Sequence, residues 1–227
     1  AIQLTRLTMA FGAVADLWFV ILLTHASSQY VYVEVHKMEL YGALMAGATV
    51  AIGLFAYGAS LNDVLDARHD STFSPERPIP AGRIRVGQAI VVTVGSLLVA
   101  MLGGVMLGLA AVGMSLLTAA GVLFYNATGK YIPAIGLTTV GLVHAAHMLI
   151  PNVNLQFTLP VWLVMTHAMV IAALVHHLED KRPRLRRRAI IVSSIGWLIW
   201  SSALLGVPMM RGDGLWPDEV NALGLIC

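Results

Sequence analysis

Three aspartates and an asparagine occur at helical spacing in one short segment, as Asn62, Asp63, Asp66 and Asp70. On a helix that turns about 100° per residue, the four side chains fall within one arc of roughly 100°, the width of a single face. Carboxylates crowded on one face repel one another unless a positive charge lies between them. A hard divalent cation such as Mg²⁺ prefers carboxylate oxygen and often bridges to a substrate phosphate. The segment therefore predicts a Mg²⁺ site, with a solvated acidic helix end as the alternative.

A basic loop rich in Pro and Gly follows the acidic segment and reads RPIPAGR at residues 77–83. Arg77 lies seven residues past Asp70, which makes it the best candidate in this loop for contacting a phosphate beside the aspartates. Arg83 and Arg85 are expected to serve membrane orientation instead. Together, the helix end and the loop offer oxygen ligands for a metal and a cation for a phosphate.

The elements that position these side chains belong to a membrane protein. The 227 residues are 58% hydrophobic and 11% charged, with a mean hydropathy of +0.78, whereas an ordinary soluble domain is about a quarter charged. A net charge of +2 is too small to suggest a nucleic-acid partner. The single cysteine, Cys227, excludes a disulfide framework and a cysteine-based metal site. A cleavable signal peptide is not expected, because the first apolar stretch carries Asp16 and lacks a small-residue cleavage pattern.

Seven apolar stretches reach or approach the length of about 20 residues that crosses a bilayer core. They cover residues 4–26, 41–61, 86–107, 112–125, 132–150, 159–178 and 189–207, of which the fourth is short. Glycines recur inside them, among others Gly103, Gly136 and Gly141, which predicts close helix packing. The expected fold is an all-α polytopic transmembrane helical bundle of about seven spans, formed as one domain over residues 1–227. Residues 222–227 are similar to the start of a further span.

The distribution of Lys and Arg predicts the orientation of the bundle. With a cytoplasmic N-terminus, twelve of the 14 Lys and Arg residues lie on the cytoplasmic side, and only Lys37 and Arg211 lie on the other. The positive-inside rule then predicts an integral protein of a bacterial-type inner or cytoplasmic membrane, with the N-terminus and the aspartate segment facing the cytoplasm. The basic run at residues 181–188 lies on the same side, where topology and anionic lipid headgroups explain most of its charge.

The pattern N-D-x-x-D-x-x-x-D at residues 62–70, followed by R-P-I-P-x-G-R, resembles the UbiA superfamily of membrane prenyltransferases. Seven fixed positions of the family's first aspartate motif and following loop are matched in order. They are Asn62, Asp63, Asp66, Asp70, Arg77, Pro78 and Gly82. The first span, with Arg6 and Asp16, looks closest to the UbiA-like branch associated with ebo-type gene clusters. UbiA-type enzymes have nine spans, so we expect this chain to lack the last two.

The resemblance implies a Mg²⁺-dependent enzyme that joins the prenyl group of an isoprenoid diphosphate to a lipophilic, usually aromatic, acceptor in the membrane. In such enzymes two aspartate-rich motifs, after the second and sixth spans, face each other across a cytoplasmic cavity. Here the resemblance implies that Asn62 supports Mg²⁺ ligation by the three aspartates at positions 63, 66 and 70. It also implies that Arg77, Lys130 and Tyr125 help to hold the diphosphate.

The second motif of this chain departs from the family pattern. Residues 176–184 read HHLEDKRPR, in which only Glu179 and Asp180 are acidic and His176 stands in place of the first aspartate. Neutral imidazole is a poor Mg²⁺ ligand compared with carboxylate. Two interpretations stay open. Glu179 and Asp180, with His176, form a reduced second clamp on the substrate, or the two carboxylates pair with the neighbouring Lys and Arg residues in an interfacial salt-bridge cluster.

Several histidines lie inside the predicted spans, notably His144, His147 and His167. Polar residues inside a membrane are functional hypotheses by default. One hypothesis is axial ligation of a haem or a chlorophyll-type pigment, and the other is a hydrogen-bonded histidine that lines a cavity or bridges helices. Asp16 is expected to face the bundle interior.

A second class of function follows from the altered second motif and the two missing spans. The protein is then a catalytically weak or inactive UbiA-like subunit of a larger membrane complex, which binds lipid, quinone or pigment. Its partners would be other membrane proteins, whereas the enzyme's partners are a prenyl diphosphate, a lipophilic acceptor and the surrounding membrane lipid.

Overall fold

The computed structural model describes residues 2–211, and every regular element in that range is a helix. This confirms the all-α bundle that the sequence predicts. The long helices of the described range are α1 (Ile2–Ala26), α3 (Leu40–Phe73), α4 (Val86–Leu107), α5 (Leu109–Ala127), α6 (Pro133–Met148), α7 (Leu159–Leu178) and α8 (Arg187–Arg211). The short ones are α2 (Glu34–Lys37) and the 3₁₀ helices η1 (Ser28–Tyr30) and η2 (Gly129–Tyr131). The predicted start of a further span at residues 222–227 lies outside the described residues.

Each of the seven predicted stretches forms one long helix. Within the described residues, five helices are long and apolar enough to cross a membrane, namely α3, α4, α5, α7 and α8. In α1, the described apolar segment is shorter than these five helices and covers Ala10–Ala26. Helix α6 has only 16 residues, because a segment of turns that contains Pro151 and Asn152 follows it. The predicted span that ends at Leu61 and the predicted helical segment at residues 62–70 form one continuous helix, α3, which runs to Phe73.

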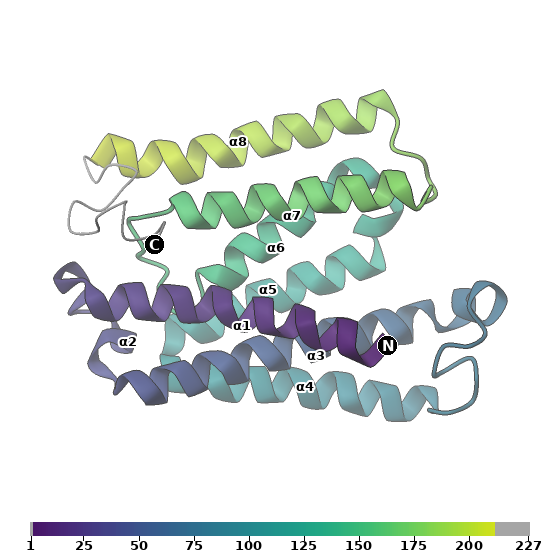
Figure 1. Cartoon of the computed structure of the whole chain (residues 1–227), viewed down its shortest axis with the longest axis horizontal. Helices are drawn as coiled ribbons and strands as arrows, with labels where there is room; N and C mark the ends of the chain where they lie inside the picture. Colours follow the sequence, from purple (N-terminus) through teal and green to yellow (C-terminus); the bar gives the residue numbers. More distant parts are fainter. Residues whose placement is uncertain (1, 212–227) are drawn as a thin grey trace.

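The helices stack across the molecule (Figure 1). Helices α7 and α8 lie along one flank, α3 and α4 along the other, and α1, α5 and α6 lie between them. Helix α3 packs most closely on α4, where glycines let the backbones touch. An added Cβ at Gly53 would lie 2.6 Å from the backbone nitrogen of Ala100, and one at Gly103 would lie 2.8 Å from the carbonyl oxygen of Ala46. Such contacts are how small residues bring membrane helices together.

Two apolar clusters form the core of the bundle. The larger joins α1, α3, α4 and α5 through fully buried residues such as Leu17, Val50 and Ala100. The smaller joins the end of α1 to α6 and α7 around Val20 and Met165. The clusters fix the helices relative to one another. The candidate site depends on this packing, because it is built from the ends of three different helices.

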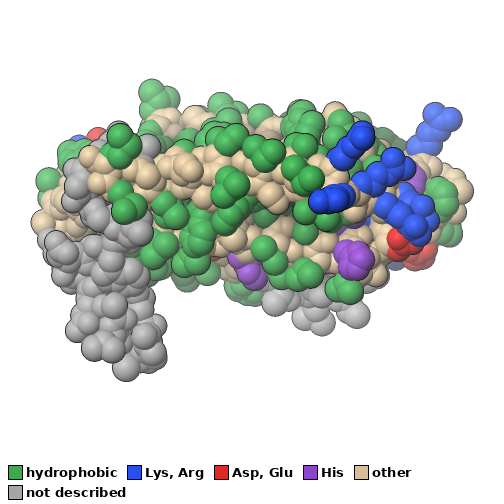
Figure 2. All heavy atoms as spheres, turned by 90° about the horizontal axis from the view of Figure 1, so that it is seen from above, with side chains coloured by type: hydrophobic (Ala, Val, Ile, Leu, Met, Phe, Trp, Pro, Cys, Tyr) green, Lys and Arg blue, Asp and Glu red, His purple; other side chains and the backbone are tan. Residues whose placement is uncertain are grey.

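Charged side chains gather at one end of the bundle. We call this the motif end and define it as residues 62–85, 128–132 and 176–188. Figure 2 shows Lys and Arg side chains collected there, while apolar side chains and a few histidines are spread over the rest of the described surface on the same face. The outer faces of α4 and α8 carry exposed residues such as Val91, Leu102 and Ile199, as expected for helices in contact with lipid.

Candidate functional site

The aspartate segment lies on the last turns of α3, as the sequence predicts. The helix remains regular through Phe73, and the Ser74 backbone N–H donates to the carbonyl oxygen of Asp70 at 2.8 Å. The chain then turns back on itself. Gly82 adopts φ +70°, a left-handed conformation that costs glycine little. The loop therefore folds against the helix end, and its first arginine returns to the aspartates.

Arg77 is the cation that this loop brings to the site. Its Nη1 donates to Asp70 Oδ2 at 2.9 Å and lies 3.9 Å from Asp63 Oδ1. The Asp70 side chain is only 6% exposed, whereas that of Arg77 is 38% exposed, so the carboxylate is shielded from water and the guanidinium is not. Arg77 thus relieves the repulsion between two carboxylates and ties the loop to α3.

Lys130 supplies the second cation, from the η2 turn between α5 and α6. Its Nζ lies 2.5 Å from Asp66 Oδ1 and 3.5 Å from Asn62 Oδ1. The side chains of Lys130 and Asp66 are each 17% exposed. A close approach of two glycines holds the turn, because a Cβ at Gly136 would lie 3.0 Å from the carbonyl carbon of Gly129. The positive charges between the carboxylates are therefore side chains of this protein.

The donor set fits Mg²⁺ in kind. It consists of carboxylate oxygens and one amide oxygen, which are the hard ligands that Mg²⁺ prefers. In the described part of the chain, however, no group of three or more His, Cys, Asp or Glu side chains is already gathered closely enough to hold a metal ion. Asp66 and Asp70 each direct an oxygen at a basic side chain instead. Metal ligation by these aspartates thus stays a prediction.

The second motif forms a salt-bridge cluster beyond the end of α7. Lys181 Nζ lies 2.9 Å from Glu179 Oε2, and Asp180 lies 3.3 Å from Arg184 Nε and 3.7 Å from Arg182 Nη2. All these side chains are at least half exposed. The structure thus shows the ion pairs of the second interpretation. A role of Glu179 and Asp180 in binding substrate stays a prediction.

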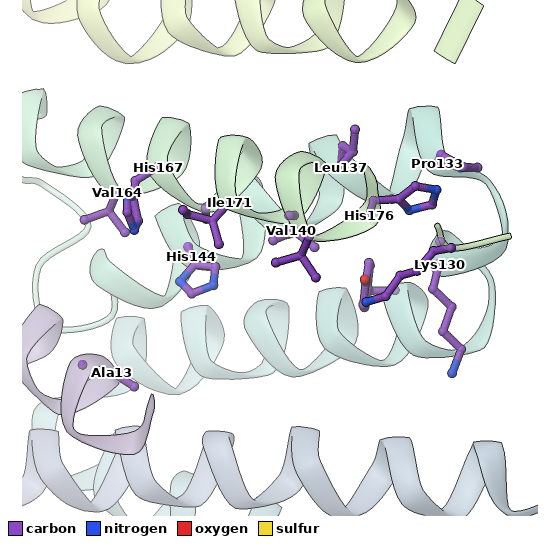
Figure 3. Close-up of a pocket in the computed structure, with 18 of the residues that line it drawn as sticks. Ala13, Lys130, Pro133, Leu137, Val140, His144, Val164, His167, Ile171 and His176 are labelled. Carbon is purple, nitrogen blue, oxygen red and sulfur yellow. The ribbon is translucent and has the colours of Figure 1, made fainter. Parts of the chain in front are cut away.

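A cavity of about 680 Å³ opens beside this site, between α1, α5, α6 and α7. Figure 3 shows Lys130 and His176 at one end of this cavity, with His144 and His167 towards the other. A second cavity, of about 520 Å³, lies between α3, α5 and α6. The two share the lining residues Ala13, Phe55, Tyr125, Val140 and His144. Most of the walls are apolar, so the charged end is a polar entrance to a hydrophobic interior.

The structure brings most of the predicted residues to this entrance. Asn62, Tyr125, Lys130 and His176 line the cavities. Asp66 forms an ion pair with Lys130, which lines the larger cavity. Asp63, Asp70 and Arg77 form the adjoining ion-pair group. His176 Nε2 also forms a hydrogen bond with the carbonyl oxygen of Pro183 at 2.9 Å. This contact joins the end of α7 to the loop of the second motif.

Lys181 is a lining residue that the sequence did not predict. The basic run indicated a topology signal, yet Lys181 lines the larger cavity beside His176. The Lys181 backbone N–H donates to the carbonyl oxygen of His176 at 3.1 Å, which turns the chain back towards the entrance. The available signal was that Lys181 closely follows the end of the predicted span at residues 159–178 in the sequence. Asp16 also lines the larger cavity, which agrees with its expected inward position.

Comparison with known proteins identifies the family. The model of the UbiA prenyltransferase family matches residues 21–210. This chain belongs to the UbiA prenyltransferase family. The UbiA resemblance read from the aspartate segment is thus confirmed, whereas the assignment to the ebo-associated branch stays a prediction.

Among UbiA relatives, digeranylgeranylglyceryl phosphate synthase of Methanosarcina barkeri is 29% identical over 131 residues. The match covers 58% of this chain and 44% of that enzyme, so it spans less than half of the relative's length. A solved structure described as giving insights into digeranylgeranylglyceryl phosphate synthase in membranes is similar with a TM-score of 0.60 at 16% identity. That similarity covers 90% of this chain and 79% of the other, and it shows a shared UbiA-like fold.

Proposed function

We propose that this protein transfers a prenyl group from an isoprenoid diphosphate to a lipophilic acceptor within the membrane. The observation that carries the proposal is the position of Lys130, which pairs with Asp66 and lines the entrance of the cavity. A diphosphate needs cations, and a prenyl chain needs apolar walls. Both lie side by side here, and the family and its prenyltransferase relative support the same reaction class.

In the proposed reaction, the bond between the allylic carbon and the diphosphate oxygen breaks, and the diphosphate leaves with the electron pair. An electron pair of the acceptor forms the new bond to that carbon, and the proton that the acceptor loses passes to the released diphosphate. Lys130 and Arg77 stabilise the negative charge that grows on the leaving oxygens, and Tyr125 lines the entrance beside them. The apolar walls exclude water, which would otherwise capture the carbon.

Asp63, Asp66 and Asp70 are the proposed ligands of Mg²⁺, with Asn62 supporting them. When bound, Mg²⁺ would neutralise charge on the diphosphate. The proposal requires the basic side chains to exchange carboxylate contacts for phosphate contacts. This exchange is chemically reasonable, because a phosphate oxygen and a carboxylate oxygen accept similar charge-assisted hydrogen bonds from Lys and Arg.

We further propose that the motif end faces the cytoplasm of a bacterial-type membrane. The clustering of Lys and Arg at this end supports that orientation through the positive-inside rule. The acceptor class stays open between an aromatic compound and a lipid. The named relative makes a digeranylgeranylglyceryl phosphate, which favours including phosphorylated glycerol lipids among the acceptors tested.

Turnover of a donor series tests the function. Purified protein in lipid nanodiscs would be mixed with C10, C15 and C20 prenyl diphosphates, Mg²⁺, and either an aromatic or a glycerol-phosphate acceptor. We expect diphosphate release that requires both Mg²⁺ and one acceptor class, together with a prenylated product identified by mass spectrometry. If the folded protein binds no donor and forms no product with any combination, the proposal is contradicted.

Replacement of Lys130 tests the phosphate contact. In Lys130→Met, we expect the affinity for a prenyl diphosphate to fall at least about tenfold, because a hydrogen bond to a charged group contributes roughly 1.5–3 kcal/mol. Titration calorimetry measures this affinity. Lys37→Met is the matched control, since Lys37 pairs only locally with Glu34 in α2, away from the entrance. Equal affinity in the two variants would exclude a phosphate contact for Lys130.

A double variant tests the second motif. In Glu179→Gln with Asp180→Asn, we expect the rate of diphosphate release to change less than about threefold, because exposed ion pairs contribute roughly 0–1 kcal/mol. The measurement is the same release assay under saturating Mg²⁺. A hundredfold loss in protein of unchanged thermal stability would instead assign these carboxylates to a second clamp.

The second candidate function is a non-catalytic subunit that binds lipid, quinone or pigment. The observation that favours it is the salt-bridge cluster, in which the carboxylates of the second motif contact neighbouring cations. Purification from native membranes distinguishes the two functions. Fixed stoichiometry with other membrane proteins, combined with no turnover by the isolated chain, would favour the subunit.

A further inference from the structure

A groove of about 860 Å³ lies at the motif end, where the start of α6 meets the start of α8. Residues 132–134 line it on the α6 side, and residues of the preceding loop and the first turns of α8 line it on the other. Four of the lining residues are arginines, at positions 182, 184, 186 and 188. Figure 2 views the molecule from the α8 side and shows basic side chains gathered at this end. The groove therefore concentrates positive charge at one place on the membrane boundary.

Carboxylates of the described residues balance only part of this charge. Arg182 Nη2 lies 3.7 Å from Asp180, and Arg184 Nε lies 3.3 Å from the same carboxyl group, so the two arginines share one negative charge. Within residues 2–211, the guanidinium groups of Arg186 and Arg188 form no ion pair and no hydrogen bond with a protein group. Like charges around one groove repel one another. The groove is therefore complementary to an anion.

An apolar stripe on α8 runs from the groove along the helix. At about 100° per residue, an arc of roughly 60° on α8 contains four side chains, one above another. They are Arg188, Val192, Ile195 and Ile199. The three apolar side chains are each at least half exposed, and Val192 also lines the groove. A charged end followed by a strip of exposed hydrocarbon is the arrangement that fits an amphiphile.

The packing of α8 on α6 fixes the position of the groove. The two helices approach closely at Gly196, where an added Cβ would lie 2.8 Å from Thr138 Oγ1. Ala189 and Ala134, which both line the groove, lie nearer the starts of the same two helices. The groove is thus placed at the boundary end of a tight helix contact, so its position depends on the fold and not on the loop alone.

The surroundings of the groove favour a lipid over other anions. Guanidinium groups bind phosphate through paired hydrogen bonds, so a phosphate group accounts for the arginines. A soluble phosphate leaves the apolar stripe without a partner, and a neutral lipid leaves the charge without one. An anionic phospholipid satisfies both, and basic pockets between transmembrane helices are known to bind anionic headgroups.

We propose that this groove binds one molecule of an anionic glycerophospholipid. Its phosphodiester contacts Arg186 and Arg188, and an acyl chain lies along the stripe of α8. The site goes beyond prenyl transfer, since it requires neither a prenyl donor nor turnover. A general attraction of the basic run to a negative membrane surface makes a different prediction. It treats Arg187 like its two neighbours, although Arg187 is outside the groove lining.

Lipid titration of the unsubstituted protein tests the binding. The whole protein in detergent would be titrated with dioleoyl phosphatidylglycerol or dioleoyl phosphatidylcholine, and bound lipid would be counted by native mass spectrometry. The two lipids share their acyl chains and phosphate but differ in net charge. We expect the first phosphatidylglycerol to bind about tenfold more tightly, because hydrogen bonds to a charged group are the strong ones. Equal affinities would overturn the proposal.

Substitution of two neighbouring arginines locates the lipid. Arg188→Gln and Arg187→Gln each remove one charge from the first turn of α8, and both side chains are exposed, so the core is left intact. We expect the affinity for phosphatidylglycerol to fall about tenfold in Arg188→Gln and less than about threefold in Arg187→Gln. Equal losses in the two variants would contradict the groove, in favour of general attraction to anionic lipid.

Competition distinguishes a lipid from a soluble anion. Inorganic phosphate and glycerol 3-phosphate carry the anionic group without acyl chains. At constant ionic strength and in large excess over the lipid, we expect neither compound to displace phosphatidylglycerol, because neither buries hydrocarbon against α8. Displacement by either compound would exclude a lipid as the occupant of this groove.

Discussion

Asp66→Asn is expected to abolish Mg²⁺-dependent release of diphosphate from a prenyl donor, with a fall in rate of at least about a hundredfold. Asp66 is the carboxylate that meets Lys130 at the cavity entrance. The substitution removes a proposed metal ligand and the charge that holds Lys130 in place. Quantification of released diphosphate at saturating donor and Mg²⁺ checks this result.

Glu76→Gln is the control for Asp66→Asn. Glu76 is an exposed carboxylate in the loop that follows the aspartate segment, so the variant makes the same change of charge a short distance from the entrance. We expect its rate to stay within about twofold of the unsubstituted protein, because the Glu76 side chain is exposed and lies outside both cavity linings described here. Turnover at the unsubstituted rate in Asp66→Asn would refute the metal role of this residue.

Gly136→Ala is expected to have the second-largest effect, on stability and on the site together. A Cβ at this position would collide with the carbonyl group of Gly129, whose carbon lies 3.0 Å away. The obstacle is backbone, so the η2 turn has to move, and Lys130 moves with it. We expect a loss of about 1–3 kcal/mol in unfolding free energy and an affinity for prenyl diphosphate at least about tenfold lower.

Gly95→Ala is the matched control for Gly136→Ala. Gly95 lies on α4, and an added Cβ there meets nothing within 4 Å. The change from Gly to Ala in a helix is itself favourable by roughly 0.5–1 kcal/mol, so we expect the control to be neutral or slightly stabilised. Thermal unfolding in detergent and donor titration compare the two variants. Gly136→Ala with unchanged stability and affinity would show that the turn tolerates the extra atom.

Much of the fold could be predicted because it depends on local properties of the chain. A bilayer requires long apolar helices, so the predicted span at residues 159–178 has the same bounds as α7. The polar continuation of α3 was predicted from a different signal, the helical spacing of the aspartates. Neither signal indicated the end of the helix at Phe73, because the apolar pattern that marks a span does not mark where a regular backbone ends.

The candidate site could be predicted only in part. The spacing of Asn62, Asp63, Asp66 and Asp70 places them on one helix face in any fold that keeps the helix. The sequence also indicated that a positive charge must lie among them. It favoured a metal, which stays a prediction, and it did not indicate that Lys130 and Arg77 also lie beside the carboxylates. Lys130 is 64 residues from Asp66, and no local pattern reports a contact at that separation.

The sequence by itself determined the class of protein, the order and approximate bounds of its helices, and the aspartate segment that carries the family resemblance. These follow from hydrophobicity and helical periodicity, which act along the chain. Only the tertiary structure decided which cations meet the aspartates, that Glu179 and Asp180 turn to neighbouring basic residues, and that Arg186 and Arg188 line a groove. The physical reason is that an ion pair or the lining of a groove depends on what lies within about 3–4 Å in space. The packing of separate helices sets that neighbourhood.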